Sequence, residues 1–146
     1  MIDDHKTAIH EKQKTIKSIL KHWESVPSSI IIGCIEECLD ENINESIFNK
    51  VLNVENWKKN DAYFVRFCLN KTKDEDLRKN FCISFLNTSN LENNNYLLSE
   101  VLKISTKSNL FSYLNSGVLQ KIVDEGLNKI ADLTNDQNYY FVKSIL

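Results

Sequence analysis

Acidic side chains crowd the segment IEECLDENINE, residues 35–45, which contains no Lys or Arg. Its carboxylates belong to Glu36, Glu37, Asp40, Glu41 and Glu45. At 100° per residue, a helix through residues 31–41 places the apolar residues of this stretch on one side and most of the acids on the other. We therefore expect these carboxylates to face solvent, where a concentrated acidic surface speeds encounter with a basic partner and repels nucleic acid.

Metal binding is the first alternative for these residue types. The carboxylates do not form a calcium loop, because no D-x-D-x-D-G pattern is present and an exposed helix cannot wrap the ion. Cys34 and Cys38 stand one helical turn apart as soft ligands, but they lie on the apolar side of the predicted helix, which favours core packing. His5, His10 and His22 include no pair at the i, i+4 spacing of a zinc site. The sequence predicts neither a metal site nor a cofactor.

Catalytic signatures are missing as well. The chain has no G-x-x-x-x-G-K-[ST] loop, no G-x-S-x-G turn, no H-E-x-x-H helix and no H-x-E paired with C-x-x-C. With three Gly in the whole chain, a phosphate-binding loop is difficult to build. We expect a protein that is not an enzyme and has no catalytic residues.

Trp57 offers a second kind of binding residue. It lies in Asn-Trp-Lys-Lys-Asn, residues 56–60, a polar setting between two predicted helices. Exposed Trp side chains are favoured anchors in protein interfaces, because a large ring is desolvated at low entropic cost. We therefore expect Trp57 to bind the partner as part of a second candidate surface, beside the five carboxylates.

Charge is unevenly distributed along the chain. Residues 1–23 carry five Lys against three acids, residues 24–56 one Lys against seven acids, and residues 57–146 twelve basic against ten acidic residues. On the first predicted helix, one arc of about 80° collects Lys6, His10, Lys14, Lys17 and Lys21. This Lys ridge either neutralises part of the acidic surface within the molecule or binds a phosphate backbone. The presence of only two Arg in the chain argues against nucleic acid as the partner.

Helical spacing and low turn content together define the fold class. Three Gly and one Pro are too few for a fold of many tight turns. Capping boxes are predicted for Thr72 with Glu75, Ser89 with Glu92, and Thr134 with Gln137. Helices are expected over residues 4–23, from Ser28-Ser29 hydroxyl caps to about residue 41, near 45–53, 61–70, and after each capping box, with a strong apolar stripe over 119–131.

We therefore predict one all-α domain, residues 1–146, built as a compact stack of antiparallel helices of the kind found in HEAT-like solenoids. An alternative is that residues 30–32 and 63–67, which are rich in branched and aromatic side chains, form strands. The N-terminus has no apolar segment of signal-peptide length and no later stretch could span a membrane, so we expect a cytoplasmic protein without a membrane partner. Its four Cys, with no C-x-x-C pair, are expected to be reduced and structural.

Lys outnumbers Arg sixteen to two and Asn and Ile are abundant, a bias typical of AT-rich coding sequence. A small helical domain of this ancestry, with the acidic segment IEECLDENINE and no active-site signature, resembles the immunity proteins of bacterial toxin and immunity pairs, of the contact-dependent inhibition type. Some of these are all-helical or HEAT-like. The resemblance implies a stoichiometric inhibitor that blocks one cognate, basic toxin domain, often a nuclease, with the five carboxylates pairing with toxin Lys or Arg. The competing interpretations are a helical scaffold or regulatory module that binds through a groove between helices, and a nucleic-acid binder that uses the Lys ridge.

Overall fold

The computed structural model of the chain describes residues 2–53, 57–88 and 95–108, together with the single positions 110, 117, 120 and 124. Within these residues every regular element is a helix and none is a strand. The elements are α1 (Ile2–Leu20), η1 (Trp23–Ser25), α2 (Ser28–Glu37), α3 (Glu41–Val51), η2 (Trp57–Lys59), α4 (Ala62–Lys71), α5 (Glu75–Thr88) and α6 (Asn95–Lys107), where η marks a 3-10 helix. The all-α prediction is confirmed for this part of the chain. The strand alternative is wrong, because residues 30–32 lie in α2 and residues 63–67 in α4.

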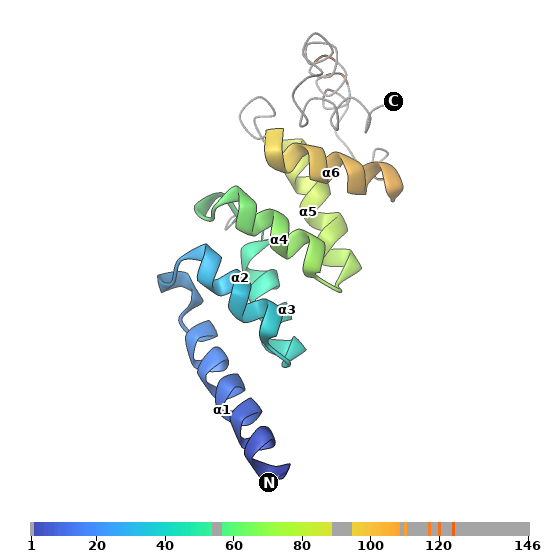
Figure 1. Ribbon diagram of the computed structural model, residues 1–146. Helices are drawn as coiled ribbons and strands as arrows, with labels where there is room; N and C mark the ends of the chain where they lie inside the picture. Colours follow the sequence, from blue (N-terminus) through green and yellow to red (C-terminus); the bar gives the residue numbers. More distant parts are fainter. Residues whose placement is uncertain are drawn as a thin grey trace, which may run out of the picture.

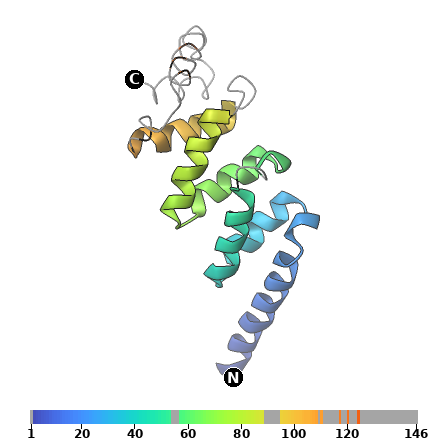
Figure 2. The same cartoon turned by 180° about the vertical axis from the view of Figure 1, so that it is seen from behind.

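The helices are stacked in chain order, from α1 at one end to α6 at the other (Figure 1). The view from behind shows the same sequence of layers (Figure 2). α4 lies in the middle, where it contacts α2, α3 and α6, while α1 packs on α2 and α5 packs on α6. Because α2, α3 and α4 meet in this middle layer, any site between them draws on side chains from three helices.

One apolar cluster runs through the stack. α4 illustrates how the sequence builds it: Phe64, Val65, Cys68 and Leu69 recur at helical spacing on one side and are all buried. Asp61 starts this helix, and its side chain accepts a hydrogen bond from the Tyr63 N–H at 3.3 Å. The cluster includes residues from every helix from α1 to α6.

α1 extends beyond the helix it packs on. With 19 residues against 10 in α2, it is about 28 Å long against about 15 Å. Ile16 and Leu20, in its second half, are buried, whereas Ile9 is 43% exposed. Ile9 lies in the first half of α1, and the N-terminal end of this helix projects past α2 (Figure 1).

Two predicted helix caps are also wrong. Pro27 occupies the N-cap of α2 without a side-chain hydrogen bond, so Ser28 and Ser29 are inside the helix instead of capping it. At the start of α5, the Asp74 carboxylate accepts a hydrogen bond from the Leu77 N–H at 3.0 Å, which is the capping role predicted for Thr72.

The turn between α4 and α5 is fixed by an arginine. The Arg78 guanidinium donates to the Leu69 carbonyl oxygen at 3.0 Å and to the Thr72 carbonyl oxygen, and it also pairs with Glu75. Carbonyls at the end of α4 have no partner within the helix, so these donors satisfy them from α5. The turn is thereby held against α4, with Thr72 only 2% exposed.

Several predictions fall outside the described residues. These are the capping boxes Ser89 with Glu92 and Thr134 with Gln137, and, apart from positions 120 and 124, the apolar stripe over 119–131. Among the residues that are described, no helix combines the length and apolar character needed to span a membrane.

Candidate protein-binding groove

The acidic segment is divided between two helices. α2 ends at Glu37, α3 begins at Glu41, and residues 38–40 between them are not helical. Asp40 is the N-cap of α3, and its carboxylate accepts hydrogen bonds from Asn42 N–H at 3.1 Å and Ile43 N–H at 3.4 Å. The prediction of one continuous amphipathic helix is therefore wrong, and Leu39, expected on its buried side, is 74% exposed.

Two amide side chains hold the corner between α2 and α3. Gln13 of α1 donates to the Glu37 carbonyl oxygen and accepts from the Leu39 N–H, both at 2.9 Å. Asn44 of α3 donates from Nδ2 to the carbonyl oxygens of Ile35 and Cys38, at 3.4 and 3.5 Å. The buried Asn44 Oδ1 has no hydrogen-bond partner within the described residues, which is the cost of directing its NH₂ group at the end of α2. The fixed corner thereby positions the acidic residues at the end of α2 and at the start of α3.

Two of the five carboxylates form ion pairs with lysines of α1. Lys12 Nζ lies 2.7 Å from Glu37 Oε2, with both side chains more than half exposed. Lys17 Nζ lies 3.8 Å from Asp40 Oδ2, and that carboxylate also caps α3. Glu37 and Asp40 are therefore paired within the molecule. The expectation that all five carboxylates face solvent without an internal partner is wrong.

Two more of the five carboxylates contact the turn between α4 and α5. The Lys73 ammonium pairs with Glu41, and both side chains are 69% exposed. Glu45 accepts from the Thr72 hydroxyl and from the Lys73 backbone N–H, each at 2.7 Å. Glu45 therefore ties α3 to the turn after α4, which is a structural role.

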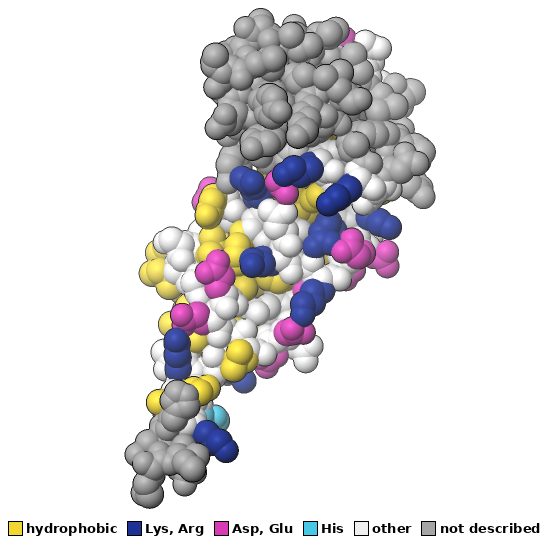
Figure 3. Space-filling model, turned by 45° about the vertical axis from the view of Figure 1, so that its right-hand side comes forward, with side chains coloured by type: hydrophobic (Ala, Val, Ile, Leu, Met, Phe, Trp, Pro, Cys, Tyr) yellow, Lys and Arg dark blue, Asp and Glu magenta, His cyan; other side chains and the backbone are white. Residues whose placement is uncertain are grey.

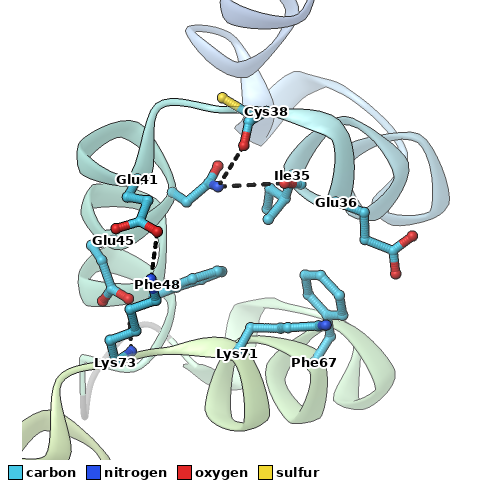
Figure 4. A pocket seen from close by; sticks show the side chains of 10 residues that line it. Ile35, Glu36, Cys38, Glu41, Glu45, Phe48, Phe67, Lys71 and Lys73 are labelled. Carbon is cyan, nitrogen blue, oxygen red and sulfur yellow. Dashed lines mark hydrogen bonds and ion pairs between the residues drawn. The ribbon is translucent and has the colours of Figure 1, made fainter.

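Glu36 is the exception among the five. It is exposed on the side of α2 that faces the end of α4, and it forms no hydrogen bond or ion pair with any described residue. In the close view its carboxylate lies across the groove from the Glu41 and Glu45 side chains, on the same side as Phe67 and Lys71 (Figure 4). The only uncompensated carboxylate of the acidic segment thus lies at the rim of a hollow.

That hollow, the α2–α3–α4 groove, has a volume of about 420 Å³. Phe48 and Phe67 form part of its lining, in an edge-to-face arrangement with ring centroids 6.4 Å apart. Lys71 Nζ lies 6.0 Å from the centroid of the Phe67 ring. Its lining residues are Ile35, Glu36, Cys38, Glu41, Asn44, Glu45, Phe48, Phe67, Lys71 and Lys73.

A second hollow, the α1–α3 groove, lies on the other side of α3. Residues 42, 43, 46, 47 and 50 of α3 line it, about 180° around the helix from the residues 41, 44, 45 and 48 that line the first. It measures about 500 Å³ and contains Lys17, Lys21 and Lys50 with one acid, Glu24, and the Trp23 ring. α3 therefore separates a groove with surplus acid from one with surplus base. On the face shown in Figure 3, acidic and basic side chains are intermingled, and apolar side chains gather toward the left side.

Trp57 is not part of either groove. It is 6% exposed, and its ring packs against Phe85 and Phe81 of α5, with centroids 5.2 and 6.0 Å away. The prediction that Trp57 anchors a partner is wrong, because its hydrophobic ring is buried in the core. The side chains of the next two residues, Lys58 and Lys59, are exposed.

The thiols are held as core groups. All four cysteines are free, with Cys38, Cys68 and Cys82 buried and Cys34 partly buried. Burial raises the pKa of the Cys82 thiol to about 12 and also raises the pKa of Cys68 and of Cys34. Such thiols are poor nucleophiles and poor metal ligands. Within the described residues, no three His, Cys, Asp or Glu side chains gather as a metal site.

The chain was compared with protein-family models, with curated proteins and with solved structures, and none of the three comparisons found a match. The fold and the groove therefore carry the functional argument on their own. They define an all-helical stack with a hollow whose rim is acidic and whose lining is partly aromatic.

Proposed function

We propose that this protein is a non-catalytic, protein-binding inhibitor, an immunity protein that neutralises a cognate basic toxin, and that the α2–α3–α4 groove is its binding surface. The observation that carries the proposal is Glu36, a carboxylate that has no partner among the described residues and lies beside an aromatic-lined hollow. Protein interfaces commonly combine an apolar, aromatic-rich centre with charged groups that provide specificity.

The internal ion pairs do not prevent this role. Glu41 with Lys73 and Glu37 with Lys12 are pairs of largely exposed side chains, and such pairs contribute roughly 0–1 kcal/mol each. A partner's Arg or Lys can therefore replace Lys73 at Glu41 at little cost. Glu45 is different, since its hydrogen bonds to Thr72 and to the Lys73 backbone hold the turn in place. In the proposal Glu36 and Glu41 contact the partner and Glu45 supports them.

The order of the helices supports the interpretation of the fold as a HEAT-like solenoid. α1 packs on α2, α3 on α4 and α5 on α6, and in solenoids of this kind a surface built from successive helices forms the binding face. The groove is built from three successive α-helices, so it lies where such a binding face would lie.

A growth assay tests the proposal. The product of the adjacent reading frame is expressed in bacterial cells alone, with this protein, and with the variants Glu36→Lys and Glu37→Lys. We expect growth arrest by the adjacent product, rescue by the native protein and by Glu37→Lys, and loss of rescue with Glu36→Lys. Both variants reverse one exposed charge of α2, but only Glu36 lines the groove. Equal rescue by both variants would remove the groove from the interface, and absence of rescue by the native protein would refute the inhibitor role.

The basic α1–α3 groove favours one second candidate, the binding of nucleic acid. Lys17 and Lys21 belong to both this groove and the Lys ridge of α1, and Trp23 offers a ring on which a base can stack. A salt titration with a single-stranded oligonucleotide tests for nucleic-acid binding. The association constant for such a ligand falls by about one power of the salt concentration for each phosphate contact. A helical scaffold that binds through the aromatic lining of the first groove would instead show little salt dependence.

A further inference from the structure

We infer that the α2–α3–α4 groove takes up one arginine side chain of the partner, with the guanidinium between the Glu36 carboxylate and the Phe67 ring, and that Lys71 competes for this position. The inference rests on the proposed function, because it names the chemical group through which a basic partner enters. It follows from the distribution of free and occupied groups around the groove.

The carboxylates on the two walls of the groove differ in how far they are already engaged. On the α3 wall, Glu45 is engaged by Thr72 and the Lys73 N–H, and Glu41 is engaged by the Lys73 ammonium. On the α2 wall, Glu36 has no partner among the described residues. An incoming cation therefore finds its strongest attraction at Glu36, on the side where Phe67 and Lys71 also lie (Figure 4).

The lining next to Glu36 is suited to a cation with an apolar stem. Lys71 Nζ already lies 6.0 Å from the Phe67 ring centroid, which shows that the ring face is open to a positive group of the chain itself. Phe48 and Ile35 supply apolar surface beside it, against which methylene groups can pack. The volume of about 420 Å³ leaves room for a whole side chain.

Arginine fits this arrangement better than lysine. A guanidinium is planar, so it can stack on the Phe67 ring while two of its N–H groups meet the two oxygens of one carboxylate. An ammonium is a compact, strongly hydrated point charge that cannot do both at once. The groove therefore distinguishes between two side chains of equal charge.

Lys71 acts as an internal competitor in this scheme. It ends α4, its side chain is exposed, and its ammonium occupies the ring face that the guanidinium would take. Displacing Lys71 requires moving only a flexible side chain, but its positive charge also repels the guanidinium of the partner. Removing the charge while keeping the apolar stem, as in Lys71→Met, is therefore expected to strengthen binding.

The test is a titration of the isotope-labelled, full-length protein with N-acetyl-arginine amide at constant ionic strength, followed through backbone amide shifts. N-acetyl-lysine amide and N-acetyl-norleucine amide serve as ligand controls. The protein variants are Glu36→Gln, Lys71→Met and, as the matched control outside the groove, Glu37→Gln. Urea unfolding of each variant verifies that it folds like the native protein.

The expected result is a saturable shift of amides in α2 and α4 around Glu36 and Phe67, with a millimolar Kd for arginine and weaker binding of both control ligands. Lys71→Met should lower the Kd about threefold to tenfold, as removal of a like charge at the surface predicts, and Glu36→Gln should raise it by about fivefold or more. Glu37→Gln should leave it unchanged. A shift that does not saturate, equal binding of lysine, or an unchanged Kd in Glu36→Gln would overturn the inference. If arginine does not bind but Glu36→Lys still abolishes rescue in the growth assay, the inference fails while the proposed function stands.

Discussion

Glu36 and Glu45 line the same groove, but the proposal gives them different roles, partner binding for Glu36 and support of the fold for Glu45, and replacing each with Gln separates these roles. The Glu45 carboxylate accepts two hydrogen bonds of 2.7 Å, from the Thr72 hydroxyl and from the Lys73 N–H. Hydrogen bonds to a charged group contribute about 1.5–3 kcal/mol each. Gln has a single acceptor oxygen, so one bond is lost, the other loses its charge, and the new NH₂ group faces a donor. Allowing for the partly exposed position of Glu45, we expect Glu45→Gln to lower the free energy of unfolding by about 2 kcal/mol.

Glu36→Gln should change the free energy of unfolding by less than about 0.5 kcal/mol, the usual range for a surface substitution that breaks no contact. The assay is urea denaturation followed by circular dichroism. With a slope of about 2 kcal/mol per molar urea, the midpoint of Glu45→Gln should fall by about 1 M while that of Glu36→Gln stays in place. Equal midpoints for the two variants would refute the assignment of Glu45 as structural. A loss of stability in Glu36→Gln would show that this carboxylate has an internal partner, and the groove would then lack its free acceptor.

Three further predictions concern buried side-chain groups. Trp57→Ala should cost about 3 kcal/mol of unfolding free energy, since it removes a buried ring from contact with Phe81 and Phe85; a cost below about 1 kcal/mol in urea denaturation would contradict the burial. Asn44→Asp should destabilise the protein by about 1 kcal/mol more than Asn44→Ala, because a carboxylate would face the two carbonyl oxygens at the end of α2; the reverse order in urea midpoints would contradict this geometry. The raised pKa of Cys82, about 12 in the folded protein, means that the unfolded chain loses this thiol proton first, from about pH 9. Unfolding free energy should therefore fall between about pH 9 and 12, by up to about 1.4 kcal/mol per pH unit for this thiol, and part of that slope should disappear in Cys82→Ala; an identical slope in the variant would contradict the assignment.

Helix identity could be predicted from the sequence where one apolar periodicity and one cap coincide. In α4, the spacing of Phe64, Val65, Cys68 and Leu69 and the cap at Asp61 agree with the observed helix, although the branched and aromatic residues at 63–67 also allowed a strand. The break between α2 and α3 could not be predicted in the same way, since Cys38 and Leu39 continue the apolar spacing of α2. The one local signal was Asp40, a residue type that favours the N-cap position.

The candidate site was predictable in composition but not in detail. The sequence locates the acids, but which of them are compensated depends on Lys12 and Lys17 of α1 and on Lys73 after α4, whose positions are set by packing. The suggestion that the Lys ridge neutralises acids within the molecule is supported for one pair, Lys17 with Asp40. Trp57 was misjudged because its sequence neighbours are polar, whereas the rings that bury it belong to α5.

The most direct test of the proposed function is the affinity of the proposed partner, a basic toxin domain, for two charge-reversal variants, measured by isothermal titration calorimetry. The account predicts that Glu36→Lys weakens binding by about 30-fold or more, equivalent to about 2 kcal/mol for a desolvated charge pair. Glu37→Lys, one residue further along α2 and outside the groove, should change the affinity by no more than about threefold. Equal losses for the two variants, or a larger loss for Glu37→Lys, would contradict the claim that the partner enters the α2–α3–α4 groove at Glu36.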